Sequence, residues 1–383
     1  MARFDVAVIG GGVAGLWTAN ALKAKGFSVV LLSKTALGDG QTLAAQGVIH
    51  GGSKYALAGK LTDSSEQLAA MPGRWKDALE GKGDVTLQGV TVLSPHQYLW
   101  SLPGVTSQVV SFFGSKLMRG RAGSIPREDW PEALQSPHYK GRVFRIDEPV
   151  LDPVSVVQRL SAPLKDDCYL GDCSLTGCDG KIDKLTIDGI EIFADKYVFA
   201  AGAGNGVLMK QLGITDFQMQ LRPLHQLIIR GDLPDFYSVC IGNGPKPPIV
   251  TTTHTDSKGR TIWWIGGDIA EAEGVQRSEE EQIAYGRATM KRLMPWINWN
   301  SYEFFTARAN RAEPFTESGD RPPGAFCRAV GNVLVTWPTK LALAPDLSDQ
   351  VVAHISGTPD RADAEQLPLK RPETGNPPWN LGD

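Results

Sequence analysis

The segment from Asp5 to Lys34, DVAVIGGGVAGLWTANALKAKGFSVVLLSK, has the pattern of a strand, a glycine-rich turn, a helix and a second strand. Residues 4–9 form an apolar run without alternation, which is typical of a parallel strand covered on both faces. A helix is predicted from Val13 to Lys25, and Gly26 is placed to end it. Val29 to Leu32 forms the second strand. This order predicts a βαβ unit of an α/β fold.

Three glycines in this segment match the spacing G-x-G-x-x-G, directly after the first strand. Gly10 permits a tight turn, Gly12 lets the backbone approach a pyrophosphate, and Gly15 lets the helix pack closely on the strand. The N-terminus of the helix offers N–H groups and the positive end of its dipole to phosphates. The segment therefore predicts a dinucleotide site, with Val13 and Ala14 among the residues that bind it.

The end of the second strand usually identifies the dinucleotide, because an acidic residue there binds the ribose hydroxyls. This chain has Ser33 and Lys34 at that place. A serine hydroxyl forms a weaker hydrogen bond with a ribose than a carboxylate does. A serine followed by a lysine suits the 2′-phosphate of NADP, so this segment on its own favours NADP.

Length and composition bound the remaining alternatives. The chain has 383 residues, enough for two domains or for one large domain with insertions. Its net charge of −3 argues against a nucleic-acid partner, and no run of 18 apolar residues predicts a membrane span. The first strand begins by Phe4, which leaves no room for a targeting peptide. We therefore expect a cytoplasmic protein without an integral membrane span.

The five cysteines predict neither a disulfide framework nor a metal site. Cys168, Cys173 and Cys178 are five residues apart, whereas zinc ligands usually occur in pairs two to four residues apart. No histidine lies close to them in the sequence. We interpret them as cysteines of strands and turns, and we expect no metal.

Further elements follow along the chain. A helix is predicted at 151–164, with Asp152 as its N-cap and Pro153 at its first position. Another is predicted at 278–296, and strands are expected within 85–100. Residues 105–118 have apolar side chains at helical spacing, which predicts a helix packed on a sheet and leaves a membrane-surface helix as the alternative. The polar residues from 359 onwards predict a surface or loose tail.

Three later segments resemble one family when they are taken with the N-terminal unit. They are GQTLAAQGVIHGG (40–52), KYVFAAGAG (196–204) and GNVLVTWPTKLALAP (331–345). Their order resembles that in the FAD-dependent oxidoreductases of the D-amino-acid oxidase and glycine oxidase group, over roughly residues 4–355. The resemblance implies FAD in place of NADP.

The resemblance also implies the architecture. The expected fold is α/β, with a Rossmann-like FAD-binding domain and a second α+β substrate domain built on a mainly antiparallel sheet. The FAD-binding domain is expected at 1–84, 145–217 and 310–360, the substrate domain at 85–144 and 218–309, and a C-terminal tail at 361–383. The active site is expected between the two domains, over the flavin.

The resemblance implies further cofactor-binding residues. Ser33 and Lys34 are expected near the adenosine ribose, Ala201 and Gly202 near the pyrophosphate, and the turn after residue 337 at the N1–C2=O edge of the flavin. The loop and turn residues implied to contact FAD are Gln41, Thr42, Ala45, Gln46, Gly47, Val48, Pro338, Thr339, Lys340 and Leu341. Pro338 has no N–H to donate, so we hypothesise that Lys340 supplies positive charge to the reduced flavin; the alternative is an ordinary surface lysine.

The family implies hydride transfer from a substrate C–H bond to flavin N5. In FFTARANRAEPF, Arg311 falls where the family has an arginine that clamps a substrate carboxylate. Arg308 should face the opposite side of the strand. The alternative is that these arginines only pair with Glu313 or Asp320. Ala312 replaces the proline that usually follows the family arginine.

Two histidines are further candidates. His50 falls where some relatives attach the flavin covalently, and we expect non-covalent contact here. His225 falls on a strand that the family runs beside the flavin, as a general base or substrate ligand, with a structural histidine as the alternative. Of Trp263 and Trp264, adjacent on a strand, one should face each side of the sheet.

The predicted function is oxidation of a small amine or amino acid, with FAD taking the hydride and oxygen or another acceptor reoxidising it. The alternative substrate is a hydroxy acid or a polyol phosphate, although no Arg/Lys cluster marks a phosphate site in the sequence. A further alternative is an NADP-binding or non-catalytic nucleotide-binding protein. The net charge of −3 argues against an FAD-dependent RNA-modifying enzyme.

Overall fold

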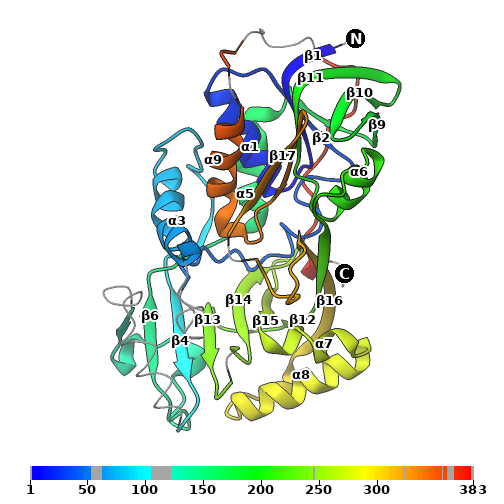
Figure 1. Ribbon diagram of the computed structural model, residues 1–383. Helices are drawn as coiled ribbons and strands as arrows, with labels where there is room; N and C mark the ends of the chain where they lie inside the picture. Colours follow the sequence, from blue (N-terminus) through cyan, green and yellow to red (C-terminus); the bar gives the residue numbers. More distant parts are fainter. Residues whose placement is uncertain are drawn as a thin grey trace.

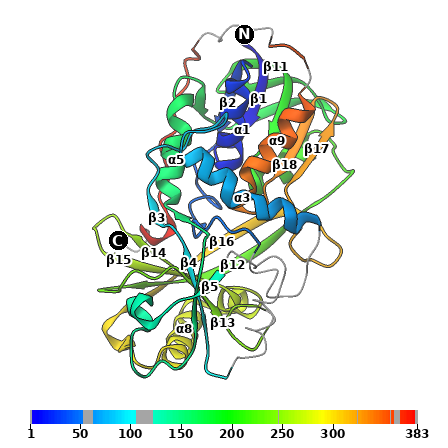
Figure 2. The same ribbon diagram turned by 90° about the vertical axis from the view of Figure 1, so that its left-hand side faces the viewer.

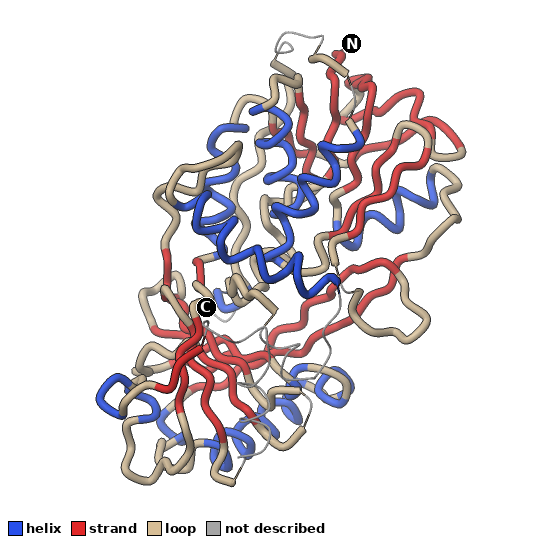
Figure 3. The backbone as a smooth tube through the Cα atoms, turned by 60° about the vertical axis from the view of Figure 1, so that its left-hand side comes forward, coloured by secondary structure: helices blue, strands red, loops and turns tan. Residues whose placement is uncertain are grey.

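Two eight-stranded sheets organise the chain, one in the upper half and one in the lower half of Figure 1. Figure 3 shows them as two separate groups of strands, each with its own helices. The computed structural model describes residues 2–52, 63–104, 122–244, 246–322, 324–355, 357–359 and 366–380. The helix predicted at 105–118 lies outside the described residues. Within the described ranges, no helix is both long and apolar enough to cross a membrane.

The first sheet has the order β17-β18-β11-β1-β2-β8, and β10 and β9 extend it from β11. The five strands from β18 to β8 are parallel, whereas β17, β10 and β9 are antiparallel to their neighbours. The bounds are β1 Ala2–Ile9, β2 Val29–Ser33, β8 Cys168–Leu170, β9 Cys173–Cys178, β10 Lys181–Ile187, β11 Ile190–Phe199, β17 Phe326–Val330 and β18 Val333–Trp337.

Helices cover both faces of this sheet, which explains the apolar run in its first strand. Val6 and Val8 of β1 pack in a core with helices on one face, whereas Ala7 and Ile9 pack on the other face. The helices of the first core are α1 Val13–Ala24, α3 Asp63–Leu79, α5 Pro153–Ser161 and α9 Ala344–His354, and α6 Asn205–Gln211 lies on the opposite face. Both faces of β1 are buried, so its sequence does not alternate.

The second sheet has the order β16-β12-β15-β14-β13-β4-β6-β5 and is antiparallel except between β13 and β4. One face packs on α8 (Glu279–Leu293) through residues such as Leu227 and Met290, beside the short helix α7 (Glu273–Gln276). The bounds are β4 Gln97–Ser101, β5 Ala122–Ser124, β6 Val143–Ile146, β12 Met219–Arg230, β13 Ser238–Ile241, β14 Val250–Thr255, β15 Thr261–Gly266 and β16 Glu303–Pro314. The predicted fold class, with a mainly antiparallel second sheet, is confirmed.

Strands β12 and β16 connect the two halves of the molecule. They pair over twelve residues, from Met219 opposite Pro314 to Arg230 opposite Glu303. At their far end, Ala312 packs in the core of the first sheet. Strand β16 therefore crosses the boundary that we expected from the sequence between residues 309 and 310.

Two segments differ from their predictions. Residues 85–91 form a loop, and strands occur only at β3 (Val92–Ser94), which pairs with β7 (Val150–Leu151), and at β4. Gly89 turns the chain with φ 88°, and Leu87 is buried against the α3 core. Residues 366–380 lie mostly at the surface, as expected, but the burial of Leu367 and Trp379 was not predicted. Figure 2 places the C-terminal end beside β14 and β15.

Helices were predicted at 151–164 and 278–296, and the structure confirms where each of them begins. The Asp152 carboxylate accepts hydrogen bonds from the N–H groups of Val154 and Ser155, and Pro153 is the first residue of α5. Ser278 and Glu281 form a capping box at α8. Side-chain oxygens thus satisfy N–H groups that have no partner within the helix.

We expect Asp152→Ala to lower the free energy of unfolding by about 1 kcal/mol, because it removes both capping bonds of α5. Asp152→Asn should stay close to wild type, since asparagine caps nearly as well as aspartate. Urea denaturation of the two variants, followed by circular dichroism, measures this. Equal losses in both variants would show that the charge, and not the cap, matters.

Candidate functional site

A groove of about 750 Å³ lies between the two sheets. Its volume is within the range of small-molecule and cofactor sites. Segments far apart in the sequence line it: Gly10–Ala14, Ser33–Ala36, Asp39–Thr42, Ala44–Ala45, Ala200–Ala203, Phe305–Asn310, Trp337–Pro338 and Lys340–Leu341, together with Ile228, Arg230, Glu279, Ala312, Asn376, Pro378 and Trp379. The β1–α1 turn is at one wall, and β12 and β16 are at the opposite wall.

The three glycines of the turn have the separate roles that their spacing predicts. Gly10 has φ 128°, and a Cβ there would lie 2.3 Å from the carbonyl oxygen of Ala200. A Cβ on Gly15 would lie 1.9 Å from the carbonyl oxygen of Gly10. Gly12 differs, because a Cβ there would meet only the Thr42 hydroxyl, at 3.2 Å, and Gly12 itself lines the groove. Gly12 therefore leaves room for a ligand to reach the backbone.

The N-terminus of α1 suits an anionic group. Its first turn contains no acidic residue, and Gly12 at the N-cap has no side chain to cap the helix. The N–H of Val13 donates to the Thr42 hydroxyl at 3.1 Å, which fixes the 40–45 loop on the helix start. A pyrophosphate at this place would gain from the helix dipole without repulsion by a carboxylate of that turn.

The end of β2 lines the groove but offers little for a 2′-phosphate. Ser33 is buried, and its hydroxyl donates to the carbonyl oxygen of Thr35 at 2.8 Å. Lys34 is exposed and pairs with Asp172 at 2.6 Å. Both side chains of this pair are exposed, so Asp172 offsets only part of the charge of Lys34.

The loop from residue 40 joins the groove to the second sheet. Gln41, Thr42 and Ala45 line the groove, and the Gln41 side chain accepts a hydrogen bond from the Ala312 N–H at 3.2 Å. Gln46 instead donates to the carbonyl oxygens of Val250 and Trp264. Gln46, Gly47 and Val48 do not line the groove. Gly47 lies against Leu151, and Val48 packs with Val150 and Tyr237.

The turn after β18 brings Pro338, Lys340 and Leu341 to the groove, beside Trp337. Lys340 is 5% exposed, so the alternative of an ordinary surface lysine is wrong. Its N–H donates to the carbonyl oxygen of Pro338 at 2.6 Å. Thr339 does not line the groove; it has a left-handed backbone (φ 58°) and its hydroxyl donates to the carbonyl oxygen of Gly324.

Ala201 and Gly202 lie on the groove at the end of β11. The indole N–H of Trp337 donates to the carbonyl oxygen of Gly202 at 3.0 Å. This bond links the end of β11 to the end of β18, the neighbouring parallel strand. The carboxyl ends of the parallel strands thus meet at one edge of the sheet, where ligands bind in open α/β sheets.

The two histidines do not join this arrangement. His225 is buried on the α7 side of the second sheet, and its Nδ1 donates to the carbonyl oxygen of Gly274 at 3.0 Å. Burial lowers the pKa of His225, as expected for a neutral structural histidine. His50 is not among the residues that line the groove.

Trp263 and Trp264 face opposite sides of the second sheet. Trp264 is on the groove side, where its indole donates to the carbonyl oxygen of Ala44.

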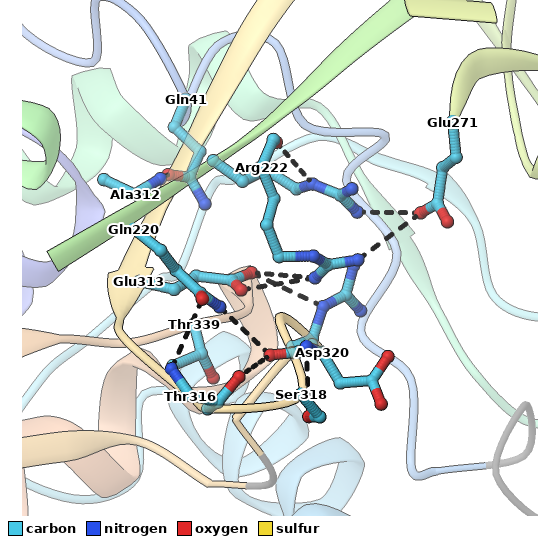
Figure 4. Close-up of polar contacts among 12 residues, drawn as sticks. Gln41, Gln220, Arg222, Glu271, Ala312, Glu313, Thr316, Ser318, Asp320 and Thr339 are labelled. Atoms are coloured by element: carbon cyan, nitrogen blue, oxygen red, sulfur yellow. Dashed lines mark hydrogen bonds and ion pairs between the residues drawn. The ribbon is translucent and has the colours of Figure 1, made fainter. Parts of the chain in front are cut away.

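A cluster of charged side chains that includes Arg222, Glu271 and Glu313 lies beside the groove (Figure 4), and Arg311 is part of it. Its guanidinium bonds to Glu271 at 3.0 Å, and its Nε donates to the carbonyl oxygen of Arg222. Burial and the neighbouring Arg321 lower the pKa of Arg311 to about 10, so it stays charged at neutral pH. The neighbours Asn310 and Ala312 line the groove, whereas Arg311 itself is not among the lining residues.

The cluster has more positive than negative groups. Arg222 and Arg321 pair with Glu313, at 3.2 and 3.6 Å, and Lys246 pairs with Glu271 at 2.9 Å. Burial alone would raise the pKa of Glu271, but Arg311 and Lys246 outweigh it and bring the pKa to about 2. Three arginines and one lysine therefore face two carboxylates, and the surplus charge is suited to an additional anion.

Several lining residues were not predicted from the sequence. Ile228 and Phe305 face the groove because alternate residues of β12 and β16 point to the same side. Asn376 and Trp379 reach the groove from the tail, whose polar composition gave no such signal. Across the described ranges, no three His, Cys, Asp or Glu side chains are grouped as metal ligands.

We expect Gly12→Ala to raise the Kd for FAD at least tenfold, because the added methyl group would stand where the backbone must approach the pyrophosphate. Gly73→Ala is the matched control, since Gly73 lies in helix α3 and a methyl group added there would have no neighbour within 4 Å. Titration of the FAD-free protein, followed by flavin fluorescence, measures both. An unchanged Kd in Gly12→Ala would place the phosphates elsewhere.

Comparison with known proteins agrees with this geometry. The family described as FAD dependent oxidoreductase matches residues 5–323. The chain is 42% identical to the probable FAD-dependent oxidoreductase PA4991 of Pseudomonas aeruginosa, over 98% of this chain and 97% of that protein. The crystal structure of PA4991 superposes with a TM-score of 0.86, at 37% identity, and covers 99% of this chain and 98% of that one.

More distant structures share the fold. Glycine oxidase from Geobacillus kaustophilus has a TM-score of 0.64 at 17% identity, and covers 94% of this chain and 97% of its own. L-amino acid deaminase from Proteus vulgaris has a TM-score of 0.66 at 16% identity, with coverage of 94% and 92%. The family match spans most of the chain, and the groove has the features that a dinucleotide requires. This protein therefore belongs to the FAD-dependent oxidoreductase family, and FAD is its cofactor.

Proposed function

We propose that this enzyme oxidises a small amine or amino acid and that oxygen or another acceptor then reoxidises it. The observation that carries the proposal is the cluster of charges around Arg311, which holds surplus positive charge beside the cofactor groove. A carboxylate is the anion that an amino acid would bring to it. The names of two structures with this fold, glycine oxidase and L-amino acid deaminase, support the same substrate class.

The residues around the groove would position the substrate and exclude water. When bound, FAD supplies the acceptor for a hydride from the substrate. Ile228, Phe305 and Trp264 form an apolar patch on the groove side of the second sheet. Such a wall orients a small substrate and keeps water from the reacting carbon. The imine that amine oxidation produces would hydrolyse after release.

Arg311, whose neighbours Asn310 and Ala312 line the groove, would bind the substrate carboxylate. Glu271 already occupies one side of its guanidinium, at 3.0 Å. A substrate carboxylate would therefore either share Arg311 with Glu271 or displace it. Arg222 lies 4.0 Å from Glu271 and could hold that carboxylate in its displaced position.

A hydroxy acid or a polyol phosphate is the second candidate substrate. The sequence showed no Arg/Lys cluster, but the fold assembles one from Arg222, Arg311 and Arg321. Such a cluster would bind a phosphate as well as a carboxylate. An anaerobic screen of amines, amino acids, hydroxy acids and polyol phosphates, followed by bleaching of the flavin absorbance, separates the candidates.

The cytoplasmic location stays an expectation from the sequence.

We expect Arg311→Met to slow flavin reduction by an amino acid about 10- to 100-fold, the equivalent of losing a charge-assisted hydrogen bond of ~1.5–3 kcal/mol. Arg311→Lys should recover part of the rate because it keeps the charge. Arg292→Met, on the exposed end of α8, is the control for loss of an arginine. Anaerobic stopped-flow absorbance measures the rates. Wild-type rates in Arg311→Met would remove the carboxylate from the proposal.

We expect Lys340→Met to lower the flavin midpoint potential by about 30 mV, since a cation near N1 stabilises the reduced, negatively charged ring. The exposed Lys210→Met of α6 is the control. Equilibration with a reference dye measures the potential. A potential equal to that of the control would show that Lys340 does not act on the flavin.

A further inference from the structure

We propose that the C-terminal segment 366–380 is a cofactor-binding element of this enzyme, in which docking of the segment and binding of FAD stabilise each other. The segment extends from the edge of the first sheet to the second sheet and closes one flank of the groove (Figure 2). The proposal rests on the FAD site and not on the identity of the substrate.

The first part of the segment follows the edge strand β8. The N–H of Leu170 donates to the carbonyl oxygen of Lys370 at 2.8 Å, and the N–H of Leu367 donates to the hydroxyl of Tyr169 at 2.9 Å. The Arg371 guanidinium lies 4.1 Å from the centre of the Tyr169 ring and donates to the carbonyl oxygen of Cys168. The segment is therefore bonded to the edge of the sheet that carries the glycine turn.

The middle of the segment is bonded to the loop that covers the glycine turn. The N–H of Leu37 donates to the carbonyl oxygen of Glu373 at 2.7 Å, and the N–H of Gly375 donates back to the carbonyl oxygen of Leu37 at 2.9 Å. One residue further along the loop, the N–H of Gly38 donates to the carbonyl oxygen of Gly11 at 2.8 Å. The segment, the loop and the phosphate-binding turn are thus three successive hydrogen-bonded layers.

The last part of the segment is anchored on the second sheet. Trp379 is 2% exposed. Its ring stacks on that of His254, with 4.2 Å between the ring centres, and meets that of Trp264 edge-on, with 5.6 Å between the ring centres. Asn380 accepts a hydrogen bond from the N–H of Ser257 at 3.0 Å. A buried tryptophan is a strong anchor, because its large ring excludes water on both faces.

Between these anchors, Asn376, Pro378 and Trp379 line the same groove as Gly10 to Ala14. A cofactor in the groove would therefore contact the segment directly. Anything that binds only the docked arrangement stabilises it, and the effect is reciprocal. FAD would hold the segment in place, and the segment would slow the release of FAD.

Titration of the full-length, FAD-free protein with FAD tests the proposal. Trp379→Ala should raise the Kd at least tenfold, whereas Trp379→Phe, which keeps an aromatic ring on His254, should stay within threefold of wild type. Gln366→Ala is the matched control: it is an exposed residue of the same segment, away from the groove, and should leave the Kd unchanged.

Asn376→Ala covers the case in which Trp379→Ala does not fold. Asn376 is exposed and lines the groove, so its removal should leave the circular dichroism spectrum unchanged and raise the Kd about threefold or more. Two results would overturn the proposal. One is that both Asn376→Ala and Trp379→Ala bind FAD with wild-type affinity. If Trp379→Ala does not fold, wild-type affinity of Asn376→Ala overturns it.

Limited proteolysis gives a second readout that is independent of activity. Lys370 is exposed, so trypsin can cleave after it when the segment undocks. Saturating FAD should slow this cleavage at least tenfold in the wild type and much less in Trp379→Ala, where the anchor on the second sheet is lost. Equal cleavage rates with and without FAD in the wild type would contradict the coupling.

Discussion

The contact between Gly10 and the end of β11 is the constraint on which the cofactor site depends. The carbonyl oxygen of Ile9 accepts a hydrogen bond from the N–H of Ala200 at 2.8 Å, so β1 and β11 end side by side. At Gly10 the chain must turn within the space beside Ala200, where any Cβ would overlap the backbone. This turn points the N-terminus of α1 at the groove and leaves Ala201 and Gly202 free to line the groove beside it.

The second sheet depends on the first through three connections that differ in kind. Strands β12 and β16 carry the pairing from one half of the molecule to the other. The loop after residue 40 reaches the second sheet through the Gln46 amide. The C-terminal segment completes the link through Trp379. Parts of all three elements border the groove, so the elements that position the second sheet also surround the cofactor site, although Gln46 itself does not line it.

Much of the fold could be predicted because local signals and the global arrangement agree. The apolar run of β1, the glycine spacing and the Asp152 cap each report a local constraint that the structure retains. Alternation also separated Trp263 from Trp264. These features depend on periods of two or 3.6 residues, which a sequence shows directly.

The parts that could not be predicted depend on contacts between distant segments. Lys34 pairs with Asp172, which lies far from it in the sequence, so no local pattern shows this partner of the cation that favoured NADP. The charged partners of Arg311 come from distant parts of the chain, between residues 222 and 321. The surplus charge of the cluster therefore appears only when the strands assemble. His225 lies on the expected strand, and its hydrogen bond to the carbonyl oxygen of Gly274 supports the alternative of a structural histidine. The burial of Leu367 and Trp379 was missed because these residues stand among polar ones in the tail.

Calorimetric titration of the purified protein with FAD and, separately, with NADPH tests the central claim most directly. We predict that FAD binds with one molecule per chain and that NADPH does not compete with it, because the chain belongs to the FAD-dependent oxidoreductase family and its groove offers backbone N–H groups to a pyrophosphate. Binding of NADPH with the exclusion of FAD would contradict this claim.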